Sequence, residues 1–221
     1  VINTKGQSMS DIKILVATHK EFYRPENPLI FQVQVGSALA DHHIEGIFHD
    51  DEGENISKKN RSYCELTAQY WAWKNLQADY YGFFHYRRYM SFKQYFPVTN
   101  GKIQLKRWTP YLEADSLEGD LSPYDLDEIH MRHVIEQYDV ITVLSEHMDV
   151  TAYEQFGQFH RIGDLDRAIA ILKEMYPEQA AACDAYMQSK YIYFCNMYIM
   201  KREYFHAYMN WLFPVLEKFE S

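Results

Sequence analysis

The chain has 221 residues, of which 47% are hydrophobic and 16% aromatic. Such a chain is too apolar to be disordered, and its length suits one α/β domain. The formal charge of -9 at pH 7 excludes a general nucleic-acid binder, because proteins of that class carry a basic face. An anionic ligand would therefore have to be held by a local basic site.

The cysteines and the start of the chain indicate a cytoplasmic protein. Cys64, Cys183 and Cys195 are an odd number and lack CxxC spacing, so we expect reduced thiols. No run of about 18 consecutive apolar residues is present, as a membrane span would need. Residues 1–8 precede Met9 without an apolar leader. We expect them to be a cloning remnant and residues 9–221 to form a single domain.

The first predicted element is a strand. An apolar run from Ile12 to Ala17 breaks abruptly into Thr18, His19 and Lys20, as a central strand does where it reaches the ligand side of an open α/β sheet. The stretch FQVQVGSALA fits either a strand or a helix. The segment IEGIFHDDEGENIS predicts a short strand that runs into an acidic loop.

A helix and a second strand follow. Apolar and aromatic side chains recur at nearly helical spacing from Asn60 to about Leu76, with Ser62 and Glu65 as a capping box. The segment YYGFFHYRRYM alternates as a strand. Proline and glycine then interrupt every pattern over residues 92–127, and so long an irregular stretch in a compact domain is more often a functional lid or insert than filler.

The second half alternates helices with strands. We expect a helix before a strand at Val140–Leu144, a helix from Asp164 that Pro177 ends, a strand over 191–201 and a last helix over Glu203–Phe219. Such alternation indicates a mainly parallel sheet flanked by helices on both faces. Core packing explains the aromatic stripe of the last helix better than lipid contact, although both interpretations stay open.

The sequence HYRRY ends the second predicted strand with two adjacent arginines. Because strand residues alternate between faces, His85 and Arg87 would share one side, and Tyr86 and Arg88 the other. A guanidinium binds phosphate oxygens in a bidentate fork, so His85 and Arg87 are candidates for a diphosphate, with Arg88 paired to a carboxylate. The alternative is two edge arginines stacked on tyrosines.

The acidic loop HDDEGENISKKN allows two interpretations. Its carboxylates at residues 50, 51, 52 and 54 would suit a hard cation, but their spacing lacks ligands on alternate positions. The alternative is a solvated turn that leads to a helix cap at Ser57 or Asn60. Asn55 and Ser57 are the weaker ligand candidates.

Asp164 and Asp166 lie where a helix is predicted to begin. One interpretation makes Asp164 the N-cap and Asp166 a first-turn carboxylate that faces the helix dipole. The other adds His160, four residues upstream, and makes one carboxylate a general base. Neither interpretation excludes the other.

The sequence contains no Walker loop and no GxGxxG, GxSxG or HExxH motif. Instead, several stretches together resemble a bacterial glycosyltransferase family from capsular and exopolysaccharide gene clusters, catalogued as a domain of unknown function (DUF4422). The matching stretches are ILVATHK, QVGSAL, DDEGENISKKNRSYCELTAQYWAWKN, YYGFFHYRRYMSF, DLD after His160 and NMYIMKREYFHAYMNWLF.

The resemblance implies a GT-A-like fold and transfer of a hexose, with galactose or galactofuranose favoured, from a UDP-sugar. The acceptor would be a growing capsular, O-antigen or exopolysaccharide glycan, free or lipid-linked, and the protein would act in the cytoplasm or peripherally at the inner face of the membrane. Family members usually continue with another helix, whereas this chain stops at Ser221. The alternative is therefore a non-catalytic nucleotide- or glycan-binding subunit.

The resemblance also assigns roles to residues. Thr18 and His19 would lie near the uridine, and His85 and Arg87 on the diphosphate. Catalysis on the acceptor side would involve Asp164, Asp166 and His160. The remaining donor-binding candidates are Asn55, Ser57, Asn60, Tyr86 and Arg88. Many GT-A enzymes hold a metal with Asp-x-Asp at the comparable strand end, which here reads His85-Tyr86-Arg87. We therefore expect no metal ligand and no cofactor, with Mn²⁺ or Mg²⁺ as the alternative.

Overall fold

A computed structural model describes residues 9–23, 25–93, 98–99, 102–103, 121 and 124–221. The chain forms two compact units, one of Val1–Thr142 with Asn196–His206 and one of Val143–Cys195 with Ala207–Ser221. That residues 9–221 form a single domain stays a prediction. Most of the predicted insert at 92–127 lies outside the described residues. Its described part includes a short antiparallel pair, β5 (Val98–Thr99) with β6 (Lys102–Ile103).

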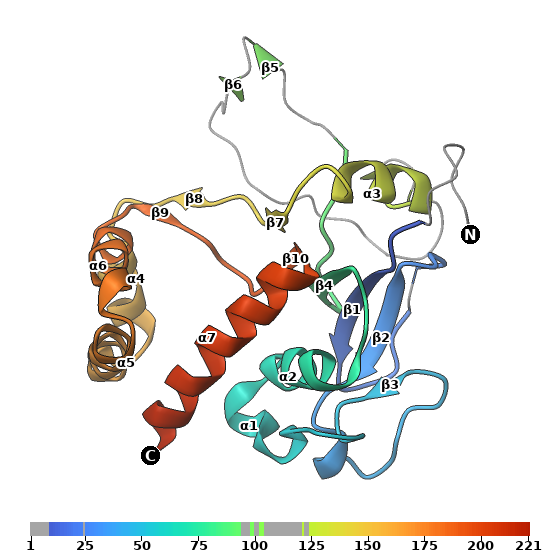
Figure 1. The fold of residues 1–221 in the computed structure, drawn as a ribbon, viewed down its shortest axis with the longest axis horizontal. Coiled ribbons are helices and arrows are strands. Elements are labelled where there is room, and N and C mark those ends of the chain that lie inside the picture. Colours follow the sequence, from blue (N-terminus) through green and yellow to red (C-terminus); the bar gives the residue numbers. More distant parts are fainter. Residues whose placement is uncertain (1–8, 24, 94–97, 100–101, 104–120, 122–123) are drawn as a thin grey trace. The chain divides into compact units, whose positions relative to one another are not determined.

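The first unit is built on a six-stranded sheet (Figure 1). Its order is β3 (Phe48–His49), β2 (Ile30–Gln34), β1 (Ile12–Thr18), β4 (Tyr80–His85), β10 (Tyr198–Lys201) and β7 (Val140–Thr142). The first four strands are parallel, and β10 is antiparallel to both β4 and β7. The predicted α/β fold with a mainly parallel sheet is therefore confirmed.

The central strands are buried on both faces, which explains their nearly continuous apolar sequences. One face of β4 carries Tyr81 and Phe83, whose rings lie 4.4 and 5.4 Å from the ring of Phe205 at the start of α7 (Arg202–Glu220). Phe205 is fully buried. Core packing in this unit therefore accounts for Phe205, one of the aromatic residues of the last helix.

The predicted helix over 60–76 is broken into α1 (Asn60–Tyr63) and α2 (Leu66–Asn75), and the expected Ser62–Glu65 capping box is wrong. Cys64 separates the two helices with a φ of 47°, a conformation that costs energy for a residue with a Cβ. The break is stabilised because the Cys64 carbonyl accepts hydrogen bonds from Asn60 Nδ2 at 2.9 Å and from the Thr67 N–H at 3.2 Å.

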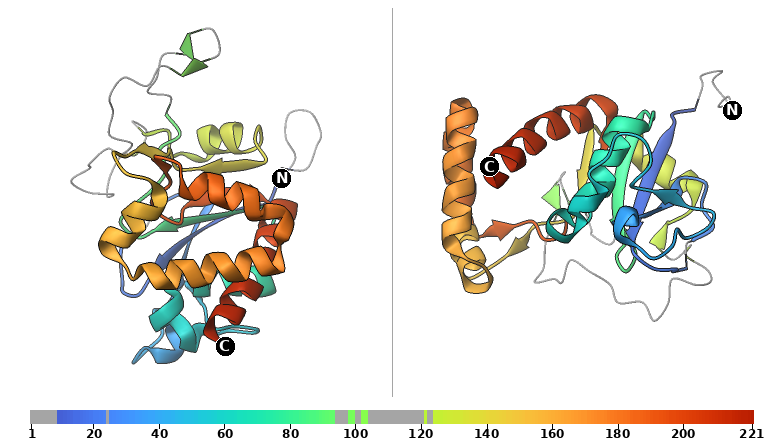
Figure 2. Two further views of the ribbon diagram at one scale, coloured as in Figure 1. Left: turned by 90° about the vertical axis from the view of Figure 1, so that its left-hand side faces the viewer. Right: turned by 90° about the horizontal axis from the view of Figure 1, so that it is seen from below.

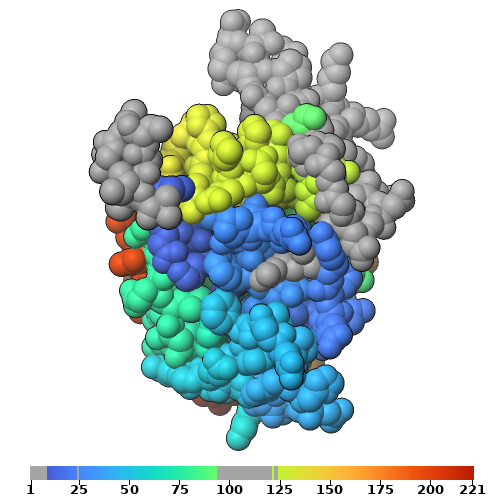
Figure 3. Space-filling model, turned by 90° about the vertical axis from the view of Figure 1, so that its right-hand side faces the viewer, coloured from blue at the N-terminus to red at the C-terminus, as the bar shows by residue number. Residues whose placement is uncertain are grey.

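Three shorter elements complete the first unit. The ambiguous segment at 31–40 is a strand to Gln34 and then a 3-10 turn, η1 (Ser37–Leu39), and a second turn, η2 (Ser57–Lys59), precedes α1. Helix α3 (Glu128–Ile135) lies beside the start of β1 (Figure 3). Arg132 Nη1 of α3 donates a hydrogen bond to the Ser10 carbonyl at 2.8 Å, which fixes this placement.

The second unit contains a short pair, β8 (Glu146–His147) with β9 (Tyr191–Ile192), and the helices α4 (Ala152–Phe159), α5 (Ile162–Met175) and α6 (Ala180–Met187), with η4 (Pro177–Gln179) between the last two. The three helices contact one another (Figure 2). The strand predicted over 191–201 is therefore two strands, β9 and β10, which belong to different sheets. None of the helices within the described ranges is long and apolar enough to cross a membrane.

Candidate functional site

The carboxyl ends of the parallel strands bring separate polar segments to one edge of the sheet. β1 ends at Thr18 and β4 at His85, and Ala17 pairs in register with His85. The residues that follow these two strands therefore lie next to each other. Ligands of open α/β sheets bind at this edge.

Tyr86 is the centre of the resulting group, which we call the Tyr86 cluster. Its side chain is buried, and the rings of His19 and Phe22 approach it edge-on at 5.4 and 5.2 Å. Two cations lie over its ring, Lys20 Nζ at 5.4 Å and Arg87 Cζ at 5.1 Å from the centroid. The cluster consists of His19, Lys20, Phe22, His85, Tyr86 and Arg87.

The turn after β4 differs from the prediction. The strand ends at His85, and the His85 and Arg88 backbones bond to each other at 2.9 and 3.2 Å. β10 pairs with β4 only as far as Phe83, and β1 pairs with it as far as His85. Beyond these partners the backbone satisfies its own polar groups by turning. The expectation that strand alternation places His85 and Arg87 on one face is therefore wrong. In the turn, the two residues are connected by a hydrogen bond instead: the Arg87 backbone N–H donates to His85 Nδ1 at 3.2 Å.

His85 is a half-buried histidine surrounded by charge. Burial of the ring lowers its pKa, the carboxylate of Glu65 opposes this shift, and the basic side chains of Arg88, Arg87 and His19 add to it. The ring is therefore mainly neutral near pH 7. Glu65, at the start of α2, lies with Oε1 3.9 Å from His85 Nε2.

Thr18 has an internal role in the segment that carries the cluster. Its side chain is 1% exposed, and its hydroxyl donates to the Lys20 carbonyl at 2.5 Å while it also accepts from the Lys20 N–H at 3.3 Å. This local turn holds His19 and Lys20 at the end of β1. Contact of Thr18 or His19 with a uridine stays a prediction.

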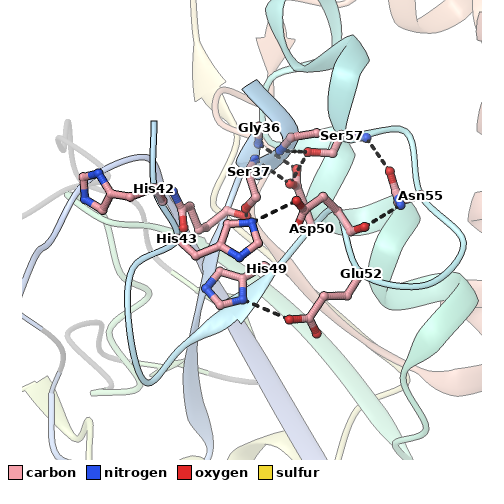
Figure 4. Close-up of polar contacts among 12 residues, drawn as sticks. Gly36, Ser37, His42, His43, His49, Asp50, Glu52, Asn55 and Ser57 are labelled. Carbon is pink, nitrogen blue, oxygen red and sulfur yellow. Dashed lines mark hydrogen bonds and ion pairs between the residues drawn. The ribbon is translucent and has the colours of Figure 1, made fainter. Parts of the chain in front are cut away.

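The acidic loop is organised around the buried carboxylate of Asp50 (Figure 4). It accepts hydrogen bonds from the backbone N–H groups of Gly36 and Ser37 at 2.8 and 2.9 Å, and from the hydroxyls of Ser57 and Thr67 at 2.5 Å each. Asp50, which directly follows β3, thus ties together η1, η2 and α2. The loop is a structural clamp at this position.

Three predicted donor-binding residues, Asn55, Ser57 and Asn60, already make hydrogen bonds within or next to this loop. The Ser57 hydroxyl is fully buried against Asp50, and Asn60 Nδ2 donates to the Cys64 carbonyl and to Thr67 Oγ1. Asn55 Nδ2 donates to the carbonyls of Asp51 and Gly53 at 2.8 and 2.9 Å. A contact of any of the three with a donor stays a prediction, and each already has partners within the chain.

Two histidines stack beside the clamp. The rings of His43 and His49 lie 4.3 Å apart, His43 Nε2 is 2.9 Å from Asp51 Oδ2, and His49 Nδ1 is 3.0 Å from Glu52 Oε1. Burial opposes charging of His49, but its hydrogen bonds to Glu52 and the Ile44 carbonyl prevail and raise its pKa. Within the described ranges, no three His, Cys, Asp or Glu side chains are grouped so that they could hold a metal ion.

The predicted catalytic residues lie in the second unit. Helix α5 begins at Ile162, two residues earlier than expected, so its N-cap is Arg161 and the expectation that Asp164 caps the helix is wrong. Asp164 is the first-turn carboxylate in place of Asp166, which was expected there, and Asp166 accepts a hydrogen bond from the Tyr153 hydroxyl at 2.9 Å. His160 ends α4 with its ring 4.7 Å from that of Phe156. A catalytic role for the three stays a prediction.

Sequence reasoning did not select three members of the strand-end region. Lys20 and Phe22 belong to the Tyr86 cluster, and Glu65 faces His85. Lys20 could have been found, since it directly follows Thr18 and His19 at the polar break after an apolar strand. Phe22 and Glu65 carry no such local signal, because only the pairing of β1 with β4 and the turn before α2 bring them here.

The comparison with known proteins agrees with this fold. The chain belongs to the family described as Domain of unknown function (DUF4422), whose model matches residues 13–221. A solved structure described as "WbbM bifunctional glycosytransferase apo structure" matches 95% of this chain at 32% sequence identity, with a TM-score of 0.80. The match covers 37% of that protein, so this chain spans little more than a third of its length. No curated protein matches.

The shared structure defines the class of fold. At this identity and TM-score, the chain has the GT-A-like fold of a glycosyltransferase.

Proposed function

We propose that this chain is a glycosyltransferase that binds a sugar nucleotide at the Tyr86 cluster and transfers its sugar to a glycan. The observation that carries the proposal is the pairing of Lys20 and Arg87 on one tyrosine ring, at the carboxyl edge of a mainly parallel sheet. Both cations are exposed in a chain whose formal charge is -9. Cations gathered locally in an acidic protein suit an anionic ligand such as a diphosphate.

The cluster can perform the electrostatic part of the reaction. Departure of the sugar leaves negative charge on the diphosphate, which fixed donors can stabilise if they already point at it. Arg87 supplies a planar fork for phosphate oxygens and Lys20 a second positive charge. The exposed aromatic rings of His19 and Phe22 offer surfaces on which a nucleobase can stack.

We further propose that the donor is a UDP-hexose, with galactose or galactofuranose favoured, and that the acceptor is a bacterial surface glycan. Family membership and the likeness to a bifunctional glycosyltransferase support a glycosyltransferase, and the finer assignments extend the family resemblance. Action at the inner face of the membrane belongs to the same proposal. Co-sedimentation with liposomes that contain a lipid-linked acceptor would test it, and recovery of the protein in the supernatant alone would contradict it.

The diphosphate is proposed to bind without a bridging metal. A divalent ion beside Arg87 and Lys20 would meet like-charge repulsion of about 4 kcal/mol for each pair of unit charges at 4 Å, in an effective dielectric near 20. We therefore expect turnover of a UDP-hexose to persist in EDTA. Loss of turnover in EDTA and its return with Mn²⁺ would contradict the metal-free proposal and identify acidic side chains as ligands.

The test of the site itself is UDP binding by isothermal titration calorimetry. Replacing Arg87 by alanine should weaken binding by about 1.5 to 3 kcal/mol, the range of hydrogen bonds to charged groups. Arg87→Lys should recover only part of this loss because lysine lacks the fork. Arg61→Ala removes an exposed arginine of α1 and serves as the control.

Two results would contradict the proposal. Equal losses in Arg87→Ala and Arg61→Ala would show a nonspecific charge effect. Binding of UDP without any transfer to glycan acceptors would favour the alternative, a non-catalytic subunit.

A further inference from the structure

Glu65 and His85 present two complementary polar atoms at the carboxyl end of β4. His85 is the last residue of the strand, and Glu65 directly precedes α2. Glu65 Oε1 lies 3.9 Å from His85 Nε2, a separation beyond a direct hydrogen bond. The Glu65 side chain is 45% exposed, so a ligand can reach it, whereas that of His85 is 16% exposed and held in place.

The hydrogen-bond pattern fixes which nitrogen of His85 carries the proton. Nδ1 accepts a hydrogen bond from the Arg87 N–H at 3.2 Å. A neutral imidazole has one donor and one acceptor nitrogen, so Nε2 must be the donor. The groups that face this ring are Glu65, His19, Arg87 and Arg88. Three of them are basic and favour the neutral ring, so Nε2–H acts as a donor while the Glu65 carboxylate only accepts.

The position of Glu65 is set by the backbone. The strained residue Cys64 precedes it, and the Glu65 carbonyl accepts the N–H groups of Ala68 and Gln69 at 3.1 and 3.4 Å. Gln69, one helical turn further on, accepts a hydrogen bond from the Tyr198 hydroxyl of β10 at 2.8 Å. This stripe of α2 therefore faces β4 and β10, on the side of β4 away from β1.

The pair is suited to a hydroxyl group. An oxygen about 2.8 Å from each atom fits between atoms 3.9 Å apart, accepts from Nε2–H and donates to the carboxylate. A phosphate oxygen has no proton to donate, and an ammonium group cannot accept. A hydroxyl does both, and sugars carry several.

We propose that Glu65 and His85 together bind one hydroxyl group of the sugar moiety of the nucleotide sugar. The inference rests on the proposed function, in which the diphosphate lies at Lys20 and Arg87. With the nucleoside toward β1 and the diphosphate at the turn after β4, the sugar extends toward the α2 side, where Glu65 lies. A ribose hydroxyl has the same chemistry, and the experiment distinguishes the two sources.

The experiment compares UDP with UDP-galactose and UDP-glucose in binding to the full chain and to Glu65→Ala, Glu65→Gln and the control Glu45→Ala. Glu45 is an exposed glutamate of the first unit. We expect Glu65→Ala to weaken UDP-hexose binding about 10- to 100-fold, as for a hydrogen bond to a charged group, and to change UDP binding less than about twofold. Glu65→Gln keeps an acceptor without the charge and should lie between.

A second arm uses UDP-hexose analogues that each lack one hydroxyl. When the hydroxyl that Glu65 binds is missing from the analogue, wild-type protein should bind this analogue only as tightly as Glu65→Ala binds the intact UDP-hexose. Glu65→Ala itself should bind the analogue and the intact UDP-hexose equally well. Such coupling would not arise from a merely structural role of Glu65. Thermal melts of each variant check that the fold is retained.

Each other result overturns the inference in a distinct way. Equal weakening of UDP and UDP-hexose by Glu65→Ala would assign the pair to the ribose, and absence of coupling to any analogue would assign it no sugar hydroxyl. If wild-type protein binds neither UDP nor a UDP-hexose, the proposed function fails and the inference with it. If UDP binds and all variants bind UDP-hexose alike, the inference alone fails.

Discussion

Asp50 shows how one residue can hold three elements in place. Its carboxylate is fully buried, and four hydrogen bonds, one from Gly36 and one each from η1, η2 and α2, compensate the charge. Such a charge is stabilised only while its donors remain in place, since an unpaired buried charge is costly. The position of Gly36 depends on the same network. A Cβ added there would lie 2.8 Å from Asn60 Oδ1, and its φ is +67°.

Replacing Asp50 by asparagine should lower the free energy of unfolding by about 2 to 4 kcal/mol. The amide offers one acceptor oxygen where two are used, and its NH₂ group would face donors that it cannot pair, each costing about 1 to 3 kcal/mol. Urea denaturation followed by circular dichroism measures the change. The control is Asp41→Asn, at an exposed aspartate. A similar, small change in both variants would show that the buried clamp contributes little.

At the scale of single residues, the sequence predicted where the candidate site lies better than it predicted the backbone conformation there. The break after Ile12–Ala17 and the HYRRY segment correctly marked the edge where the Tyr86 cluster forms. The alternation argument for His85 and Arg87 failed because β4 ends at His85, the last residue that pairs with β1, and the chain then turns back on itself. The hydrogen bond from the Ser57 hydroxyl to Asp50 could not be predicted from the sequence, since the two residues meet only in the folded loop.

Gly82 controls how closely β4 approaches its neighbours. A Cβ at this position would lie 2.8 Å from Ile14 Cγ1 of β1 and 3.0 Å from Ile199 Cγ1 of β10. Glycine inside a strand often marks such a close approach. The neighbouring side chains are branched and packed between strands, so they cannot move aside freely.

Gly82→Ala should therefore destabilise the protein by about 1 to 3 kcal/mol, as overpacking does in a dense core. Gly163→Ala provides a control of opposite sign. Gly163 lies in α5, with nothing within 4 Å of an added Cβ, so alanine should stabilise that helix by up to about 1 kcal/mol. Urea denaturation of the two variants against wild type measures both effects. A neutral Gly82→Ala variant would show that the strands adjust without cost.

The elements that were missed or misplaced from the sequence differ in how clearly their residues predict them. Helix α4 is short, yet Thr151 and Glu154 form a capping box at its start, a signal readable in the sequence. Helix α5 starts two residues before Asp164, and its first turn includes Ile162 and Gly163. The break at Cys64 had no such signal. It depends on carbonyl contacts with Asn60 and Thr67, and Thr67 in turn binds Asp50.

At the scale of the whole molecule, the net charge and the local charge at the candidate site have opposite signs. The formal charge of -9 argues against a nucleic-acid surface, but it says nothing of the local cations at Lys20 and Arg87. The division of the chain into two units could not be predicted from the sequence either. The chain passes between them after Thr142, Cys195 and His206, and no Pro- or Gly-rich linker marks these points.

Ligand binding can show how the two units unfold. Every member of the Tyr86 cluster, and Glu65, belongs to the first unit. A ligand stabilises a state only if that state binds it better than the alternative, so UDP should oppose unfolding of the first unit alone. With UDP at about 100 times its dissociation constant, the effect is about 2.7 kcal/mol.

Amide hydrogen exchange measures this stabilisation segment by segment. We expect UDP to slow exchange about 100-fold for the slowest amides of β1 and β4, which open only when the first unit unfolds. Amides of α4, α5 and α6 should change less than about threefold, because opening of the second unit leaves the cluster intact. The control is Arg87→Ala, in which the same UDP concentration should give a smaller effect on β1 and β4. An equal 100-fold slowing in α5 would contradict independent unfolding and establish residues 9–221 as the single cooperative domain that the sequence predicts.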